Sequence, residues 1–239
     1  MQSFFSQAAT GRRVVTSFNE DLRKYMLGIY NFMSLALGIS ALVAFVALKT
    51  GITLAIMRSP VGILVSFAPF FLVMYMSVKL QSIDFVKARN LFFGFAALMG
   101  LSLSSLALMF SGAEITRAFF ATAGMFGGMS FYGYTTGKDL SSMASTVIMV
   151  VWGLIIASFI NIFLHSSAMQ FFISFVSVIA FALLTAYDTQ KLKNAYYQMS
   201  GRYSESEIAK MSLFGALQLY MDFINIFVNL LYLLRATRD

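Results

Sequence analysis

Long apolar runs separated by short polar segments make up the chain from residue 26 onward. Each run holds about 20 mostly apolar residues, the length that an α-helix needs to cross the hydrocarbon core of a bilayer. We predict a membrane-spanning helix in each of seven such runs. The predicted spans are Met26–Leu48, Val61–Leu80, Leu91–Phe110, Ala113–Thr135, Ser142–Leu164, Met169–Tyr187 and Met211–Leu234.

The seven spans predict an all-α integral membrane protein built as one seven-helix bundle. The predicted connections are short, except for the segment Thr189–Lys210 between the sixth and seventh spans. No internal repeat or soluble domain interrupts the pattern. The predicted organisation is a cytoplasmic N-terminal segment at 1–25, a transmembrane domain at 26–235 and a short C-terminal tail at 236–239.

Composition supports a lipid-embedded chain. Hydrophobic residues make up 59% of the sequence and charged residues only 11%, whereas soluble domains carry about 25% charged residues. The net charge of +7 would suit a nucleic-acid partner in a soluble protein. Membrane proteins instead accumulate Lys and Arg in cytoplasmic loops, so we expect the bilayer as partner and no nucleic acid. The absence of Cys excludes thiolate chemistry.

The distribution of basic residues predicts the orientation in the membrane. With the N-terminus inside, the five outer residues would be Lys49, Arg58, Arg117, Arg235 and Arg238, and the other twelve of the 17 Lys and Arg residues would face the cytoplasm. This bias favours a cytoplasmic N-terminus and, with seven spans, an external C-terminus. The inner residues are Arg12, Arg13, Arg23, Lys24, Lys79, Lys87, Arg89, Lys138, Lys191, Lys193, Arg202 and Lys210.

The seventh span contains one polar stripe. Gln218, Asn225 and Asn229 lie within about 60° of Asp222 on a helical projection, and the other faces are apolar. A carboxylate near the centre of a span costs about 2.5–3.5 kcal/mol on insertion scales. A proton, a cation, a basic partner or water must therefore compensate Asp222. The alternatives are that the two asparagines only bond between helices and that Asp222 is a structural ion pair or a permanently protonated acid.

A second unusual carboxylate, Asp188, ends the sixth predicted span. The macrodipole disfavours an acid at a helix C-terminus, and Lys191 one turn later would partly offset this. Asp222 lies about 15 Å deeper if both helices are straight. The two carboxylates meet only if the sixth helix continues past Asp188, which the sequence allows because no helix breaker occurs before Gly201.

Two carboxylates that meet inside a bundle have a definite chemistry. They share a proton and titrate as a unit, and they supply hard oxygens for a cation such as calcium, which takes six to eight oxygen ligands. We therefore predict that Asp188 and Asp222 bind calcium and sense protons. Asn225, Asn229 and Gln218 are predicted to support coordination. Such a partial cage would bind weakly enough to release the ion.

Four segments resemble the Bax inhibitor-1 (transmembrane Bax inhibitor motif) family. They are TAYDTQKLK and LYMDFINIFVNLL around the two aspartates, TGKDLSSM before the fifth span and IASFINIFL late within it. The resemblance covers the chain from about the second span onward. The chain as a whole is similar to bacterial members of the family. It implies six helices around a central seventh and a pH-sensitive calcium leak channel in the inner membrane. Asp188 and Asp222 would be its di-aspartate sensor.

The resemblance also implies a rival function and shows one departure. Bacterial relatives are linked to a membrane-anchored ATP-dependent protease as modulators, so a protease is the alternative partner. Some relatives have an arginine in the second helix that pairs with the aspartates, where this chain has only Lys79. Lys79 would form a latch as a point charge, without a bidentate fork, or it would extend to the interface.

No enzyme motif occurs, so we expect a protein without catalytic residues or a tightly bound cofactor, with Ca²⁺ as the bound or permeant ion. A calcium/proton antiporter is a variant of the channel. Tyr187-Asp188 matches half of an intramembrane aspartyl protease signature, but no GxGD surrounds Asp222. The two small-residue pairs Gly124-xxx-Gly128 and Gly133-xxx-Gly137 predict close helix packing rather than a hinge.

Overall fold

The computed structural model describes residues 2–79, 82–199 and 204–236, with side chains from Glu20 onward except those of Met199 and Glu205. These residues form helices and no strand. The helices are α1 (Gln2–Lys49), α2 (Ile52–Met57), α3 (Val61–Lys79), α4 (Phe85–Leu103), α5 (Leu106–Met109), α6 (Gly112–Thr135), α7 (Ser141–Leu164), α8 (Ser167–Met199) and α9 (Glu205–Ala236).

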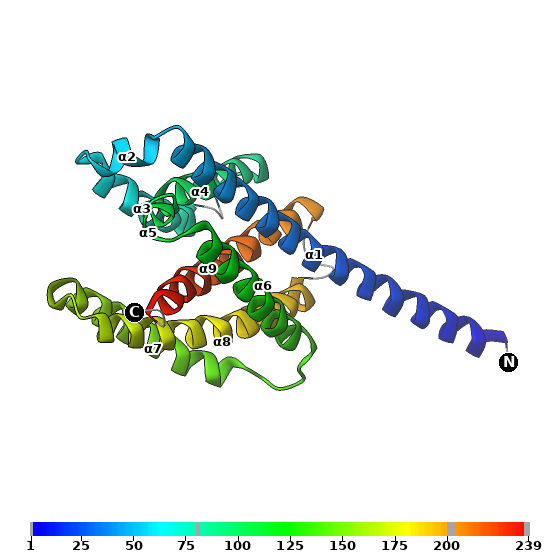
Figure 1. Cartoon of the computed structure of the whole chain (residues 1–239). Coiled ribbons are helices and arrows are strands. Elements are labelled where there is room, and N and C mark those ends of the chain that lie inside the picture. Colours follow the sequence, from blue (N-terminus) through cyan, green and yellow to red (C-terminus); the bar gives the residue numbers. More distant parts are fainter. Residues whose placement is uncertain (1, 80–81, 200–203, 237–239) are drawn as a thin grey trace.

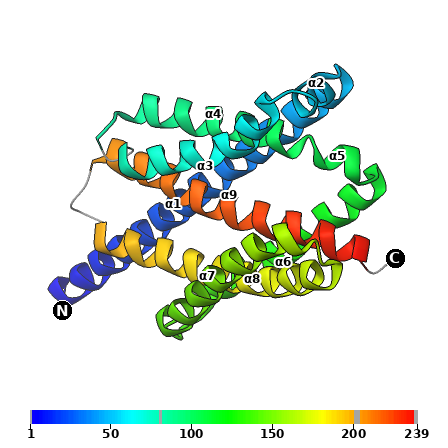
Figure 2. The same cartoon turned by 90° about the vertical axis from the view of Figure 1, so that its left-hand side faces the viewer.

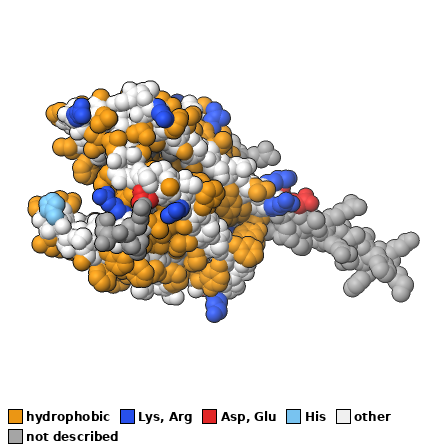
Figure 3. Space-filling model, in the orientation of Figure 1, with side chains coloured by type: hydrophobic (Ala, Val, Ile, Leu, Met, Phe, Trp, Pro, Cys, Tyr) orange, Lys and Arg blue, Asp and Glu red, His pale blue; other side chains and the backbone are white. Residues whose placement is uncertain are grey.

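Six stretches of the described chain are long and apolar enough to cross a membrane. They lie in α1, α3, α4 with α5, α7, α8 and α9, so six predicted spans are matched. The fourth predicted span corresponds to α6, which is long enough at 24 residues. It is not among the six because Gly, Ser and Thr residues and the pair Glu114 and Arg117 lower its mean hydropathy. Hydrophobic side chains cover much of the face in Figure 3, as a lipid-facing surface requires.

Helix α9 lies between two groups of helices, one formed by α1 to α4 and the other by α6 to α8 (Figures 1 and 2). It packs against α1, α4, α6 and α8, while α3 packs mainly on α4, and α7 mainly on α8. Its span is also the most buried of the six. Asp222 of the predicted polar stripe is therefore buried by other helices, whereas Gln218, Asn225 and Asn229 are half-buried.

At three places the helix ends differ from the ends of the predicted segments, because a hydropathy pattern finds apolar runs and not helix ends. α1 begins at Gln2 and passes through the predicted boundary at residue 25 without a break. The long connection Thr189–Lys210 does not exist, because α8 runs to Met199 and α9 begins at Glu205. The third span is interrupted, since α4 ends at Leu103 and α5 starts at Leu106. Leu80, the predicted end of the second span, lies outside the described residues.

Local chemistry explains the extended ends. Leu192 and Tyr196, beyond the apolar run of α8, are buried in the main core, so packing stabilises three further turns. α9 begins with a capping box in which the Glu207 carboxylate accepts the Ser204 N–H at 2.8 Å and Ser204 Oγ accepts the Glu207 N–H at 3.4 Å. This Ser-x-x-Glu pattern is a helix-start signal that the apolar run alone does not contain.

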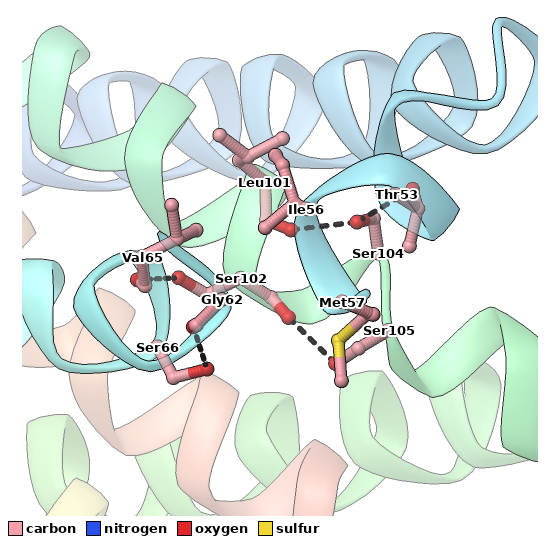
Figure 4. A pocket seen from close by; sticks show the side chains of 10 residues that line it. All are labelled: Thr53, Ile56, Met57, Gly62, Val65, Ser66, Leu101, Ser102, Ser104 and Ser105. Atoms are coloured by element: carbon pink, nitrogen blue, oxygen red, sulfur yellow. Dashed lines mark hydrogen bonds between the residues drawn. The ribbon is translucent and has the colours of Figure 1, made fainter. Parts of the chain in front are cut away.

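The junction of α4 and α5 is fixed by hydroxyl groups (Figure 4). Thr53 on α2 donates to Ser104 Oγ at 2.9 Å, and Ser102 donates to the Val65 carbonyl on α3 at 2.7 Å. Ser104 and Ser105 bond to carbonyl oxygens one turn earlier. The cavity between these residues is only about 10 Å³, and the hydroxyls named here have protein partners. This cluster is therefore a structural joint.

Each of the two groups of helices contains one close backbone contact. A Cβ placed on Gly100 of α4 would lie 2.7 Å from Ser40 Cα on α1, and one on Gly133 of α6 would lie 2.7 Å from the Ala186 carbonyl carbon on α8. Gly133 therefore serves the packing role predicted for it. A Cβ at Gly124, Gly128 or Gly137 would meet nothing within 4 Å, so the prediction for these three glycines is wrong.

Replacing Gly133 should destabilise the bundle, because the added methyl group overlaps backbone rather than a movable side chain. We expect Gly133→Ala to cost about 1–3 kcal/mol, measured as a lower unfolding temperature of the purified protein in detergent. Gly128→Ala on the same helix is the matched control and should be neutral or stabilising by about 0.5–1 kcal/mol. Equal stability of the two variants would contradict the close contact between α6 and α8.

Candidate functional site

Asp188 on α8 and Asp222 on α9 come together inside the bundle. Each side chain is 5% exposed. The Asp188 carboxyl group interacts with the Asp222 carboxyl group, the Gln218 amide and the Lys191 ammonium group. The structure thus brings together two aspartates that are far apart in sequence, and it adds Gln218 from the predicted polar stripe.

The length of α8 makes this meeting possible. Because α8 continues to Met199, the two helices run side by side for about three turns below Asp188 before the chain turns back. The sequence predicts that the two carboxylates meet only if the sixth helix continues past Asp188, and this continuation is confirmed. Thr185 and Thr189 flank Asp188 on the same helix and are both fully buried, so this stretch of α8 faces the interior.

The carboxylates are not fully satisfied by the surrounding protein. Asp222 Oδ2 is buried and has no hydrogen-bond partner among the described residues. Lys191 is the cation that acts on Asp188, but its ammonium group is exposed and lies 6.0 Å from the centre of the Tyr187 ring. Two buried carboxylates in contact need a proton or a cation between them. The unpartnered oxygen of Asp222 is positioned to receive either one.

A chain of buried hydroxyls holds α8 in place beside the aspartates. Ser130 Oγ on α6 lies 2.9 Å from Thr189 Oγ1, and the Tyr30 hydroxyl on α1 bonds to the same Ser130 Oγ. Three helices are thereby joined at the level of Asp188. Sequence reasoning missed this arrangement, because single Ser, Thr and Tyr residues in apolar runs have no distinctive spacing.

Gln190 fixes the α6–α7 connection to the same part of α8. Its side-chain amide donates to the Lys138 carbonyl at 2.7 Å and accepts the Leu140 N–H at 2.9 Å. Lys193 adds a bond to the Tyr134 carbonyl at 2.7 Å. The residues that follow Asp188 in TAYDTQKLK are therefore the ones that fasten α8 to its neighbours, which gives the motif a structural basis.

The remaining residues of the polar stripe point along α9 itself. The Asn225 amide donates to the Met221 carbonyl and the Asn229 amide to the Asn225 carbonyl, both at 2.8 Å. The amide N–H groups of these two asparagines therefore bond within α9 and not between helices, contrary to that alternative. Their oxygens remain available as acceptors one and two turns from Asp222.

Lys79 lies away from the carboxylates in this structure. It is the last residue of α3, its side chain is exposed, and no ion pair joins it to Asp188 or Asp222. This conformation has Lys79 free of the predicted latch contact, and the latch itself stays a prediction about another state.

Other acidic groups do not extend the site. Across the described residues, no cluster of three or more His, Asp or Glu side chains is arranged to hold a metal. Asp139 lies in the exposed connection before α7, where hydrogen bonds from the Ser141 hydroxyl and backbone N–H hold the pKa of its carboxyl group below its usual value. It stays charged at neutral pH and forms part of the helix start.

Almost the whole chain is similar to one family of known proteins. The family described as "Inhibitor of apoptosis-promoting Bax1" matches residues 22–239, so the similarity includes the first span as well as the later ones. Protein RP147 of Rickettsia prowazekii is 40% identical over 93% of this chain and 94% of its own length. Inner membrane protein YbhL of Escherichia coli K12 is 39% identical over 88% of this chain and 90% of its own length. The chain therefore belongs to the Bax inhibitor-1 family of membrane proteins.

Proposed function

We propose that this protein is a pH-sensitive calcium leak channel in which Asp188 and Asp222 bind the ion and sense protons. One observation supports the proposal above all others: two buried carboxylates lie close enough to interact, and Asp222 Oδ2 has no partner among the described residues. A permanently paired structural acid would have its oxygens satisfied by the protein. An unsatisfied oxygen favours an exchangeable ligand, either a proton or a cation.

The donor set suits transient binding of calcium. The two carboxylates and the Gln218 amide oxygen provide fewer than the six to eight oxygens that calcium takes. Helical backbone carbonyls are engaged in their own hydrogen bonds, so water would complete the shell. Asn225 and Asn229 would support coordination along the exit path, and Lys79 would latch the closed state. We assign no catalytic role to any residue and no resident cofactor.

We further propose that the chain forms seven spans around α9, with α6 as the fourth. The bacterial inner membrane is the proposed location, because the related protein YbhL is named as an inner membrane protein. The bias of Lys and Arg supports a cytoplasmic N-terminus. The side chains of Arg12, Arg13, Arg202 and Arg238, which enter that bias, lie outside the described residues.

Calcium should stabilise the wild-type protein through the aspartates. At about 100 times its dissociation constant, a ligand that binds only the folded state adds about 2.7 kcal/mol, which we expect to see as a higher unfolding temperature in detergent at pH 8. Asp222→Asn removes one anionic ligand and should abolish most of this effect. Protons occupy the same oxygens, so the effect should shrink as the pH falls.

Asp139→Asn is the matched control for calcium binding, because it makes the same chemical change at an exposed carboxylate outside the pair. This variant should keep the full calcium effect. Equal stabilisation of wild type, Asp222→Asn and Asp139→Asn by calcium would place binding elsewhere and contradict the proposed site.

Calcium flux should depend on pH through the same residues. In liposomes that contain purified protein and a trapped calcium indicator, we expect wild-type flux to change between pH 6 and pH 8. Asp188→Asn and Asp222→Asn should each give a pH-independent flux, because the pair that titrates is broken. A pH profile of Asp222→Asn identical to that of wild type would refute the sensor.

The same vesicles separate a channel from a calcium/proton antiporter. An indicator of internal pH replaces the calcium indicator while a calcium gradient is applied. A leak channel moves calcium without a stoichiometric movement of protons, whereas an antiporter acidifies or alkalinises the lumen in proportion to the calcium moved.

A second candidate function is modulation of a membrane-anchored ATP-dependent protease, and the shape of α1 favours it. The first half of α1 extends away from the bundle (Figures 1 and 2), which suits contact with another protein. We expect such a protease to co-purify with the full chain and not with a chain that lacks residues 1–24. Co-purification that is independent of this segment would refute the role of α1.

A further inference from the structure

A large apolar cavity lies beside α9, on the face of that helix opposite to the paired aspartates. Its volume is about 650 Å³, within the range of about 300–1,000 Å³ that small-molecule sites occupy. Residues of α1, α5, α6 and α9 line it, among them Ala44, Ala107, Phe119 and Phe227. An apolar cavity excludes water and accepts apolar ligands.

The cavity is long enough for a lipid chain. Its wall on α1 runs from Leu37, past Ser40, whose hydroxyl lies 2.7 Å from the buried Tyr220 hydroxyl, to Lys49 at the end of that helix. Leu37 and Lys49 are separated by roughly 18 Å along the helix axis. Half of a bilayer's hydrocarbon core is about 15 Å thick, so the wall covers the depth reached by one lipid chain.

Two cations lie beside aromatic rings that line the cavity. The Lys49 ammonium lies 5.7 Å from the centre of the Phe45 ring, and the Arg235 guanidinium lies 5.7 Å from that of Phe110. Both phenylalanines line the cavity. The aromatic contacts hold both positive charges beside the lining, and Lys49 is itself a lining residue.

The other charged groups at this end of the bundle do not make the net charge negative. Arg58 ends α2, and Arg117 lies in the second turn of α6. Glu114 lies in the first turn of α6, and its carboxylate accepts the N–H and hydroxyl of Ser111 at 2.7 Å. Basic groups beside an apolar space between membrane helices are the features that bind anionic lipid headgroups.

We propose that this cavity holds one acyl chain of an anionic phospholipid from the leaflet at the Lys49 end, which is the outer leaflet in the proposed orientation, with its phosphate group at Lys49. The chain fills the apolar space, and Lys49, together with Arg235 beside Phe110, selects the headgroup. This site is separate from the proposed ion site, because neither Asp188 nor Asp222 lines the cavity, and it does not depend on calcium flux.

The single Trp of the chain makes a direct test possible. Trp152 on α7 is 62% exposed and reports on ordinary surrounding lipid. A cavity reporter is made by Phe119→Trp in a Trp152→Phe background. Both proteins are placed in nanodiscs of phosphatidylcholine that contain a small matched fraction of brominated phosphatidylglycerol or brominated phosphatidylcholine, and quenching of Trp fluorescence is measured.

We expect brominated phosphatidylglycerol to quench the cavity reporter at roughly tenfold lower fractions than brominated phosphatidylcholine. The two lipids should quench Trp152 equally. Lys49→Gln with Arg235→Gln should remove the preference at the cavity reporter. The pair Lys87→Gln and Arg89→Gln, which removes the same charge at the opposite end, should leave it intact. Ala44→Phe with Ala107→Phe should reduce quenching by both lipids.

Each variant is first checked for a single elution peak and a cooperative unfolding transition. A preference that survives Lys49→Gln with Arg235→Gln would overturn the assigned headgroup contact. Equal quenching of the cavity reporter by both lipids would overturn selection of an anionic lipid. Absence of quenching by either lipid would show that something else, such as a second copy of the chain, fills the cavity.

Discussion

The burial of two carboxylates in an apolar bundle is the constraint on which this structure depends. Each aspartate is costly inside a membrane, and placing them close together adds repulsion unless a proton or a cation lies between them. The two carboxylates come together because α8 extends to Met199 and packs along α9. Tyr30, Ser130 and Thr189 then join three helices at the same level. In the proposed function, such a site would change state by exchanging its ligand rather than by moving its backbone.

The sequence predicts the architecture well where the physical signal is strong. Six apolar runs match helices of spanning length because hydropathy measures the transfer of side chains into lipid. Helix ends are less predictable from the same signal. The last three turns of α8 depend on the packing of Leu192 and Tyr196, and α6 has too many small and polar residues to appear apolar although it packs against α8 and α9.

The candidate site was predictable in part. Asp222 stands out because an acid in an apolar run is rare, and Gln218 follows from helical periodicity. The contact with Asp188 depended on a helix length that no local pattern fixes. The fastening role of Thr189 and Gln190 was not predictable, because their partners lie on other helices about 50 to 60 residues away in the chain. The amides of Asn225 and Asn229 turn to their own helix, an outcome that periodicity does not distinguish from coordination.

The two proposed sites use opposite faces of α9. Asp222 and the other residues of the polar stripe face one way, while Phe223, Ile224, Phe227 and Leu231 line the apolar cavity on the other. Asn225 and Asn229 continue the stripe outward and do not line the cavity. An ion that leaves the aspartates in that direction would therefore follow the asparagines, whereas a lipid chain would press on the aromatic face. The two proposed ligands would act on the same helix from different sides, so they would occupy the protein together, and each would change the energy of any rotation or shift of α9.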